Sequence, residues 1–508
     1  MKVKLLFLLL LLFSLNACKD TKDDNDDPKT SELTDDEFTN QWAYNKMKSL
    51  YLWNTELPSS PNYTQAPKAF FESILYNYGS VNGDRFSWIE EDTSKKTKAL
   101  YADANLGFEC IPTNYFPTSA SSSTSIGFFV VYVYEGSDAY KKGLRRGQVI
   151  YRVNNVDVAY SNYSTLLKDV SSVTLSVYNN NGVQVTLNSI QTVEEKKSPI
   201  FISKVITATT GAKIGYLMYT GFERNSDDKE DNYEYDIELI ESIRTLNSQG
   251  ITDFVLDLRY NPGGYLTSAM ALASALVPNR KTSNIFAKET YNAHFQDSIV
   301  KKYGVNSLNE YFLDKAYGTN TAIPNLNLTR LYVIAGEYTA SASELVIHAL
   351  KPYMTVVHIG ETTVGKDKAS MTVKSDNERI KWQLQPLISR LTDVNGTGNY
   401  INGLSPDTKV SEMEEGYTMK GAYYIDSNGN RVEIECPELS SWTGGFGQLG
   451  DPSEPLLAEA IAKITGVARV KTKSALSTSD WIPVQVPKLK YNEQRQRIII
   501  DQDKFSKK

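Results

Sequence analysis

The sequence predicts a multidomain α/β protein: a small N-terminal helical region, a β-rich domain, and a larger α/β unit with a mixed, largely parallel sheet. Its 508 residues suffice for about three domains. Hydrophobic residues make up 41% and charged residues 22% of the chain, which is ordinary for globular proteins. From about residue 201, apolar strand-like runs alternate with helical patterns, as in parallel sheets with crossover helices.

Charge and composition argue against nucleic-acid binding and against some kinds of metal site. Lys and Arg total 54 against 60 for Asp and Glu, a net charge of −6, which argues against a nucleic-acid partner. The chain has three histidines and three cysteines, too few for a His-rich metal site or a cysteine zinc cluster. We therefore expect no metal and no cofactor.

The N-terminus is typical of an export signal, predicted over residues 1–17. Two lysines precede an apolar run over residues 5–15, which is too short to span a bilayer, since spanning needs about 20 residues. A buried N-terminal helix is the alternative. The segment Leu15–Cys18 resembles the lipobox of bacterial lipoproteins, which implies cleavage before Cys18 and lipidation of its thiol. The protein is then expected in the cell envelope, lipid-anchored in the outer membrane and either periplasmic or surface-exposed, with residues 18–33 as an acidic tether.

Residues 34–100 form the predicted N-terminal helical region. Thr34 and Glu37 have the spacing of a capping box, so a helix is expected to begin there. Ala69–Leu75 is a second candidate helix. The aromatic residues of this region are interpreted as core, and no chemistry is predicted here.

Residues 104–192 form the predicted β-rich domain. Phe128–Tyr134 is a candidate strand, Ser137–Lys142 a short helix, and the runs Val173–Tyr178 and Val183–Leu187 flank a turn, which predicts a hairpin. Thr118–Thr124 is a serine-rich stretch that we interpret as a flexible loop.

Part of this domain resembles a PDZ domain. The resemblance rests on Gly143–Ile150 and Val153–Val156, and the chain departs from the usual pattern at Gln148 and Asn155. It implies that Gly107 and Phe108 lie in a carboxylate-binding loop. A protein or peptide with a free C-terminus would then bind by strand addition. The alternative is a small β domain without a ligand.

Residues 201–470 form the predicted α/β unit, followed by an unassigned extension over residues 471–508. The expected strands are Ile214–Tyr219, Phe254–Leu258, Leu331–Ala335 and Thr355–Ile359. The expected helices are Tyr233–Leu246, Leu266–Leu276, Glu344–Leu350 and Pro455–Ile464. An aromatic loop is expected over Trp442–Gly447.

Three segments of this unit have patterns that suit acyl-transfer chemistry. In Asp257–Gly264 a strand ends at a pair of glycines, a turn that aims backbone N–H groups outward and suits a developing oxyanion. In Gly336–Glu344, small residues surround Ser341 and leave its hydroxyl accessible. In Gly360–Lys366 a lysine follows a strand, and a lysine acts as a general base only when desolvation keeps it neutral. Each pattern alone also fits a plain loop, a helix cap or a surface charge.

Together and in this order, the three segments resemble the C-terminal processing peptidases, also called tail-specific proteases, which are Ser/Lys enzymes with a PDZ domain. The resemblance implies that Ser341 is the nucleophile and Lys366 the general base. It also implies an oxyanion hole from the backbone N–H of Ala342 and of Gly263 or Gly264.

Two departures from this family concern the lysine. Asp367 stands where many members have glycine, and Ser370 stands where they have a glutamine that orients the amine. The Ser370 hydroxyl is the candidate replacement. An anionic Asp367 close to the amine would disfavour the neutral base, but in an extended segment its side chain points to the opposite face.

The leading hypothesis is a lipid-anchored, secreted serine endopeptidase that cleaves extended or unfolded protein tails. The alternative is an inactive peptide-binding lipoprotein that captures C-termini through its PDZ-like domain. A Ser/His enzyme using His348 is less favoured, because that residue lies about two helical turns beyond Ser341.

Overall fold

The computed structural model describes most of the chain from residue 33 onward. The described residues are 33–92, 106–115, 125–168, 170–179, 182–192, 198–226, 231–412, 418–425, 431–438, 447–469 and 497–500. The predicted signal peptide, Cys18, almost the whole tether, Thr118–Thr124 and nearly all of the aromatic loop Trp442–Gly447 lie outside these residues.

The N-terminal unit contains helix α1 (Asp35–Leu50), the short helix η1 (Asn54–Glu56), helix α2 (Pro67–Ser73) and strand β1 (Trp88–Glu91). The predicted capping box is present: the Thr34 side chain accepts from the Glu37 backbone, and the Glu37 carboxylate accepts from the Thr34 N–H at 2.9 Å. The strand was not predicted. It pairs with a strand far along the chain, β17 (Trp382–Gln385), and ties this unit to the α/β unit.

An antiparallel sheet follows, here called the β2–β7 domain. Its strands are β2 (Phe108–Tyr115), β3 (Ser125–Val133), β4 (Val149–Val153), β5 (Val156–Asp157), β6 (Ser172–Tyr178) and β7 (Gln184–Gln191). The sheet order is β2-β3-β4-β6-β7, with β5 paired to β4, and helix α3 (Asp138–Lys141) begins at the cap Ser137. The predicted hairpin is the pair β6–β7. Its interior is a separate apolar cluster that includes Phe108, Phe128 and Ile150.

The first sheet of the α/β unit has the order β19-β15-β14-β10-β9-β8. Its strands are β8 (Ile200–Thr207), β9 (Lys213–Tyr219), β10 (Asp253–Asp257), β14 (Arg330–Ala335), β15 (Thr355–Gly360) and β19 (Thr408–Lys409). All neighbouring pairs are parallel except β8–β9, so the expected largely parallel sheet is confirmed. The helices are α4 (Glu234–Ser248), α5 (Leu266–Leu276), α7 (Ala342–Leu350) and α8 (Pro455–Thr465).

A second six-stranded sheet was not predicted. Its order is β11-β22-β16-β18-β12-β13. The strands are β11 (Gly263–Tyr265), β12 (Ile285–Tyr291), β13 (Asn309–Tyr311), β16 (Lys368–Ser370), β18 (Leu387–Thr392) and β22 (Arg497–Ile499). Helix α6 (Ala293–Tyr303) and the short helix η3 (Val305–Leu308) lie between β12 and β13 in the chain. Several of these strands have only three residues, which is too short for a periodic hydrophobic pattern.

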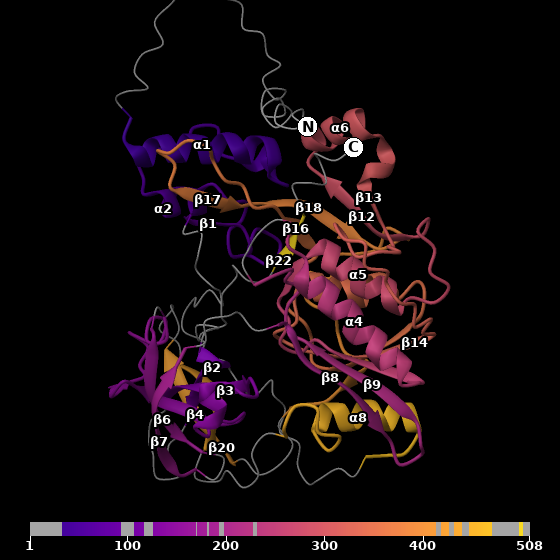
Figure 1. Ribbon diagram of the computed structural model, residues 1–508. Coiled ribbons are helices and arrows are strands. Elements are labelled where there is room, and N and C mark those ends of the chain that lie inside the picture. Colours follow the sequence, from indigo (N-terminus) through magenta and orange to yellow (C-terminus); the bar gives the residue numbers. More distant parts are fainter. Residues whose placement is uncertain are drawn as a thin grey trace, which may run out of the picture.

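The N-terminal helices and the β2–β7 domain flank the α/β unit on the same side, at its two ends (Figure 1). A hairpin of β20 (Thr418–Ile425) and β21 (Arg431–Glu438) lies close to β2. Cys110 is a buried free thiol in β2. Among the helices in the described part of the chain, none has the length and apolarity needed to cross a bilayer.

Candidate active site

The three segments singled out in the sequence meet in one place. The carbonyl of Asn261, in the turn after β10, accepts the Ala340 N–H at 3.1 Å and the Ser343 hydroxyl at 3.0 Å. The Val364 N–H, in the loop after β15, donates to the Thr339 carbonyl at 3.1 Å. The turn after β10 and the loops after β14 and β15 are therefore hydrogen-bonded to one another.

Ser341 lies at the sharp turn between β14 and α7. Its backbone has φ 64° and ψ −115°, a left-handed conformation that is uncommon for residues other than glycine and is often found at functional sites. The residue is fully buried, and its Oγ has no hydrogen-bond partner among the described residues. A buried hydroxyl without a partner is costly in a folded protein, so this one is a candidate for a chemical role.

The carboxylate of Glu344 joins the Ser341 loop to the Lys366 loop. One oxygen, Oε2, accepts the backbone N–H of Ser341 at 2.7 Å and that of Lys366 at 2.8 Å. The other, Oε1, accepts the Gly365 N–H at 2.7 Å and the Thr363 hydroxyl at 2.5 Å. The backbone nitrogens of Ser341 and Lys366 therefore share a single acceptor atom.

Burial of Glu344 raises the pKa of its carboxyl above 4.5, while the four hydrogen bonds oppose that rise. Its side chain is fully buried, so the charge is stabilised by these donors rather than by water. The motif around Ser341 contained Glu344, but its role was missed, because nothing in the sequence shows that four donors from two loops converge on it.

Lys366 is also buried, at 1% exposure. Its Nζ lies 4.9 Å from the centre of the Phe86 ring, which belongs to the N-terminal unit. The neighbouring Arg85 donates from Nη2 to the Gly365 carbonyl at 3.0 Å and to the Ile401 carbonyl at 3.1 Å. Lys366 therefore packs against the Phe86 ring. The preceding residue, Gly365, is held by Arg85, the neighbour of Phe86.

The turn that carries Arg85 and Phe86 is itself anchored. The buried carboxylate of Asp84 accepts the backbone N–H of Phe86 at 2.9 Å and of Ser87 at 2.8 Å through Oδ1, and the Tyr51 hydroxyl at 2.8 Å through Oδ2. The Ser87 hydroxyl accepts the Leu387 N–H of β18 at 2.8 Å. Phe86 is buried, as expected for the aromatic residues of this region, and its ring also faces the Lys366 amine of the candidate site.

The candidate oxyanion donors differ in how they are engaged. Ala342 is the first residue of α7, where backbone N–H groups lack acceptors within the helix. The Gly263 N–H already donates to the Asn261 side chain at 2.9 Å. Gly264 has φ 142°, and a Cβ there would lie 2.1 Å from the Phe222 carbonyl oxygen, so only glycine fits this position.

Two residues that depart from the family pattern have partners of their own. Asp367 is fully buried and pairs with the Lys368 ammonium at 2.5 Å, with Arg390 at 4.0 Å. Ser370 is buried in β16, and its hydroxyl accepts from the Gln385 amide at 2.9 Å. The charge of Asp367 is thus matched by other cations, and the orientation of the Ser370 hydroxyl is tied to Gln385.

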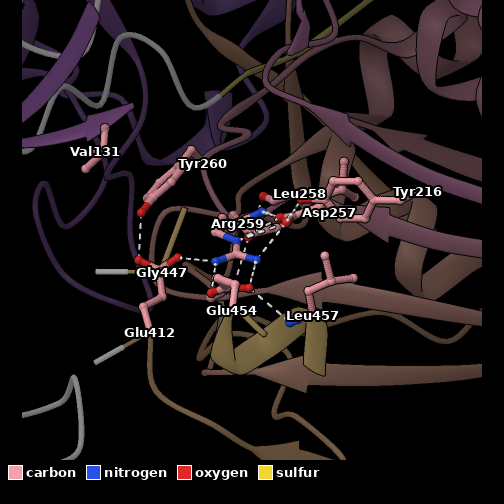
Figure 2. A network of polar contacts seen from close by, with 12 residues as sticks. Val131, Tyr216, Asp257, Leu258, Arg259, Tyr260, Glu412, Gly447, Glu454 and Leu457 are labelled. Atoms are coloured by element: carbon pink, nitrogen blue, oxygen red, sulfur yellow. Dashed lines mark hydrogen bonds and ion pairs between the residues drawn. The ribbon is translucent and has the colours of Figure 1, made fainter. Parts of the chain in front are cut away.

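The turn after β10 is held by a buried charge network (Figure 2). The Arg259 guanidinium binds Asp257 at 2.8 Å, Glu412 at 2.9 Å and Glu454 at 2.7 Å. The neighbouring Tyr260 donates its hydroxyl to Glu412 at 2.6 Å. Because Glu454 also caps α8 through the Leu457 N–H at 3.0 Å, this helix is tied to the turn.

The β2–β7 domain joins the same network through Arg146. This buried guanidinium donates to the Val131 carbonyl at 2.6 Å within its own domain, and to the Tyr260 hydroxyl at 2.6 Å across the boundary. It also pairs with Glu412 at 3.2 Å. Burial pushes the pKa of Glu412 upward, but the charges of Arg146 and Arg259 outweigh burial and hold the pKa below 4.5.

The residues predicted to bind a peptide terminus lie elsewhere, at the start of β2. Gly107 has φ 78°, and a Cβ there would lie 2.4 Å from the Ser137 Cβ, so the loop packs closely against the start of α3. Phe108 is fully buried in the core of the domain. Strand β2 is an edge strand of its sheet. Within the described ranges, no group of three or more His, Cys, Asp or Glu residues is arranged to hold a metal ion.

Comparison with known families identifies the α/β unit. The family model "Peptidase family S41" matches residues 213–410, and "Peptidase S41 N-terminal domain" matches residues 39–88. The matched parts of the chain, in the α/β unit and the N-terminal unit, belong to peptidase family S41. The second match ends just beyond Phe86, so the S41 N-terminal domain supplies the aromatic ring beside Lys366.

Curated relatives and a solved structure agree with the S41 assignment. A "Probable CtpA-like serine protease" of Staphylococcus aureus strain MRSA252 is 23% identical over 380 residues, covering 73% of this chain and 66% of the relative. The protein of that name from Staphylococcus epidermidis strain ATCC 12228 is 25% identical over 283 residues, covering 54% and 49%. The chain thus spans about half to two thirds of these relatives. A candidate S41 protease from Bacteroides fragilis NCTC 9343 has a crystal structure with TM-score 0.62 and 26% identity, covering 84% of this chain and 98% of that one.

Proposed function

We propose that this S41 protein is a serine endopeptidase that cleaves extended or unfolded protein tails, with Ser341 as nucleophile and Lys366 as general base. The observation that carries the proposal is the shared acceptor: one Glu344 oxygen binds the backbone N–H of both residues. Two segments 25 residues apart in sequence are thereby held side by side, with a hydroxyl that has no partner among the described residues.

The proposed reaction begins with a neutral Lys366 amine, which takes the Ser341 Oγ–H proton as Oγ attacks the scissile carbonyl carbon. The carbonyl electrons move to oxygen, and the oxyanion is stabilised by the backbone N–H of Ala342 and Gly264. The C–N bond then breaks, and Lys366 returns the proton to the leaving amine. Water, activated by Lys366, hydrolyses the acyl-enzyme and regenerates Ser341.

The surroundings of Lys366 support this chemistry. Burial disfavours an ammonium, so it favours the neutral amine that a base requires. The face of Phe86 then stabilises the positive charge that appears once the proton has moved, a contact worth about 0.5–2 kcal/mol.

The test is hydrolysis of an unstructured peptide with an apolar C-terminus by the full chain. We expect cleavage by the wild type and none by Ser341→Ala or Lys366→Ala. Activity that survives Lys366→Ala would refute the Ser/Lys mechanism. If the wild type binds peptides but hydrolyses none, the alternative, an inactive peptide-binding lipoprotein, is correct.

We further propose that the β2–β7 domain is a PDZ-like module that recognises a free C-terminus near Gly107 and Phe108. The place of β2 at the end of its sheet supports this, because an extended peptide can add to it as a further strand once the neighbouring β20–β21 hairpin moves away. Amidation of the peptide's terminal carboxylate should then raise KM and leave kcat unchanged. Equal KM values for the free and the amidated peptide would contradict this role.

For the cell envelope, we propose a lipid anchor on Cys18, supported by the sequence Leu15–Cys18. Metabolic labelling with a radioactive fatty acid should mark the wild type and leave Cys18→Ala unlabelled. Labelling of both proteins would exclude Cys18 as the anchor.

A further inference from the structure

Strand β22 occupies an unusual position in the second sheet. It lies between β11 and β16 and is parallel to both. Gly264 pairs with Ile498, Ser370 pairs with Ile499, and the Ile500 N–H donates to the Ser370 carbonyl at 3.0 Å. This strand comes from residues 497–499, more than a hundred residues beyond the other strands of the sheet.

The two neighbours of β22 begin at or close to residues of the proposed active site. Strand β11 begins with the glycine pair of the oxyanion turn, and β16 begins two residues after Lys366. The far side of β11 is closed by Phe222, whose carbonyl accepts the Tyr265 N–H at 2.7 Å. Without β22, a slot of about 10 Å, twice the spacing of neighbouring strands, would separate β11 from β16. That slot has the width of one extended peptide.

The segment in the slot is apolar and well covered. Residues 498–500 are all isoleucine; Ile499 is 9% and Ile500 1% exposed. Ile500 belongs to the same apolar cluster as Ala342, the residue after the nucleophile, and Ala369 of β16. With the segment in place, neither Ser341 nor Lys366 is open to solvent.

We propose that the slot between β11 and β16 is the site where an extended, branched-aliphatic peptide segment binds by strand addition, and that residues 497–500 occupy it as an intramolecular ligand. The inference rests on the proposed function, since it makes this slot the place where substrate meets Ser341. A strand of three residues is held by few backbone hydrogen bonds, so a substrate of matching chemistry displaces it. The same segment then limits the activity of the unoccupied enzyme.

Binding in trans tests the proposal without any need for hydrolysis. The probe is a fluorescein-labelled peptide with the sequence of residues 497–503, and the protein is the full chain carrying Ser341→Ala. The labelled peptide can bind only to molecules whose slot is empty, so its apparent Kd falls as the fraction of such molecules rises. A substitution that loosens β22 raises that fraction and therefore tightens peptide binding. We expect Ile500→Ala to lower the apparent Kd at least tenfold in fluorescence polarisation.

The matched control is Ile323→Ala, a buried isoleucine of the same apolar cluster outside the second sheet, at 4% exposure. Both variants should lower the melting temperature, and only Ile500→Ala should change peptide binding. If Ile500→Ala lowers the melting temperature but leaves binding unchanged, β22 is a permanent part of the sheet and the proposal is wrong.

Hydrogen exchange of the full-length Ser341→Ala protein keeps the proposal testable if Ile500→Ala does not fold. Added peptide should accelerate amide exchange in residues 497–500 and leave exchange in β18 unchanged; equal protection with and without peptide would overturn the inference. In the catalytically intact background, Ile500→Ala should raise kcat/KM several-fold on an unfolded substrate. Should the variant bind the peptide while neither protein hydrolyses any substrate, the proposed function fails and the slot assignment stands.

Discussion

Replacing Glu344 with glutamine is the sharpest test of how the site is held together. The substitution keeps the size of the side chain and removes two acceptor positions, because an amide NH₂ group takes the place of one carboxylate oxygen. Each oxygen now accepts two donors, so two buried donors would face another donor. A buried donor left without an acceptor costs about 1–3 kcal/mol, so we expect Glu344→Gln to lower the free energy of unfolding by about 2–6 kcal/mol.

Urea unfolding followed by circular dichroism measures this loss, and hydrolysis of an unstructured peptide measures the effect on the site. We expect kcat to fall at least a hundredfold, because one amide orientation leaves the Ser341 and Lys366 N–H groups without their acceptor, and the other leaves the Gly365 N–H and the Thr363 hydroxyl without theirs. The matched control is Glu241→Gln on α4, an exposed residue paired with Arg244, for which the expected change is at most about 1 kcal/mol. A Glu344→Gln protein as stable and as active as the Glu241→Gln control would refute the argument.

Three further predictions concern the surroundings of the site. Phe86→Ala should lower kcat/KM for an unstructured peptide about two- to thirtyfold, because it removes a ring contact with the Lys366 amine worth about 0.5–2 kcal/mol, whereas the buried control Phe71→Ala should leave kcat/KM unchanged. Arg146→Met should cost about 1–3 kcal/mol in urea unfolding, because it removes the donor to the Val131 carbonyl, while Glu412 keeps Arg259 as its partner; unchanged stability would contradict this. Burial raises the pKa of Glu337 to about 8, with smaller contributions from the charges of Glu361 and Glu412. The folded protein therefore keeps a proton on this carboxyl that the unfolded chain releases above about pH 4.5. That contribution to stability is lost as the pH rises through 8, and Glu337→Gln should be more stable than the wild type at pH 9 and equal to it at pH 4; parallel stability curves would contradict this.

The first sheet and its helices could be predicted from the sequence, because each element is long enough to show its own period. The apolar run Phe254–Leu258 and the Ala/Leu-rich run Leu266–Leu276 fall on β10 and α5 with at most a one-residue difference at the ends. The second sheet could not be predicted. Strands of three residues such as β11 and β16 depend on partners far away in the chain, and local pattern carries no information on those partners.

Part of the candidate site could likewise be predicted from the sequence, and part could not. Sequence motifs identified the turn and both loops, because glycines and small residues are needed there for local reasons. The contributions of Phe86 and Arg146 come from other parts of the fold, and both residues look like ordinary core or surface residues in the sequence. Glu344 stood inside a recognised motif, and only the convergence of four donors shows what its carboxylate does.

The charge network around Arg259 has a consequence for biosynthesis. Its partner Glu454 follows 195 residues later, well after Ser341 and Lys366 have been made. A polypeptide emerges from the ribosome N-terminus first, so the nascent chain already contains Ser341 and Lys366 while Arg259 still lacks Glu454, the last of its three carboxylate partners. The charge network that holds the turn after β10 is therefore complete only once helix α8 has been added to the chain.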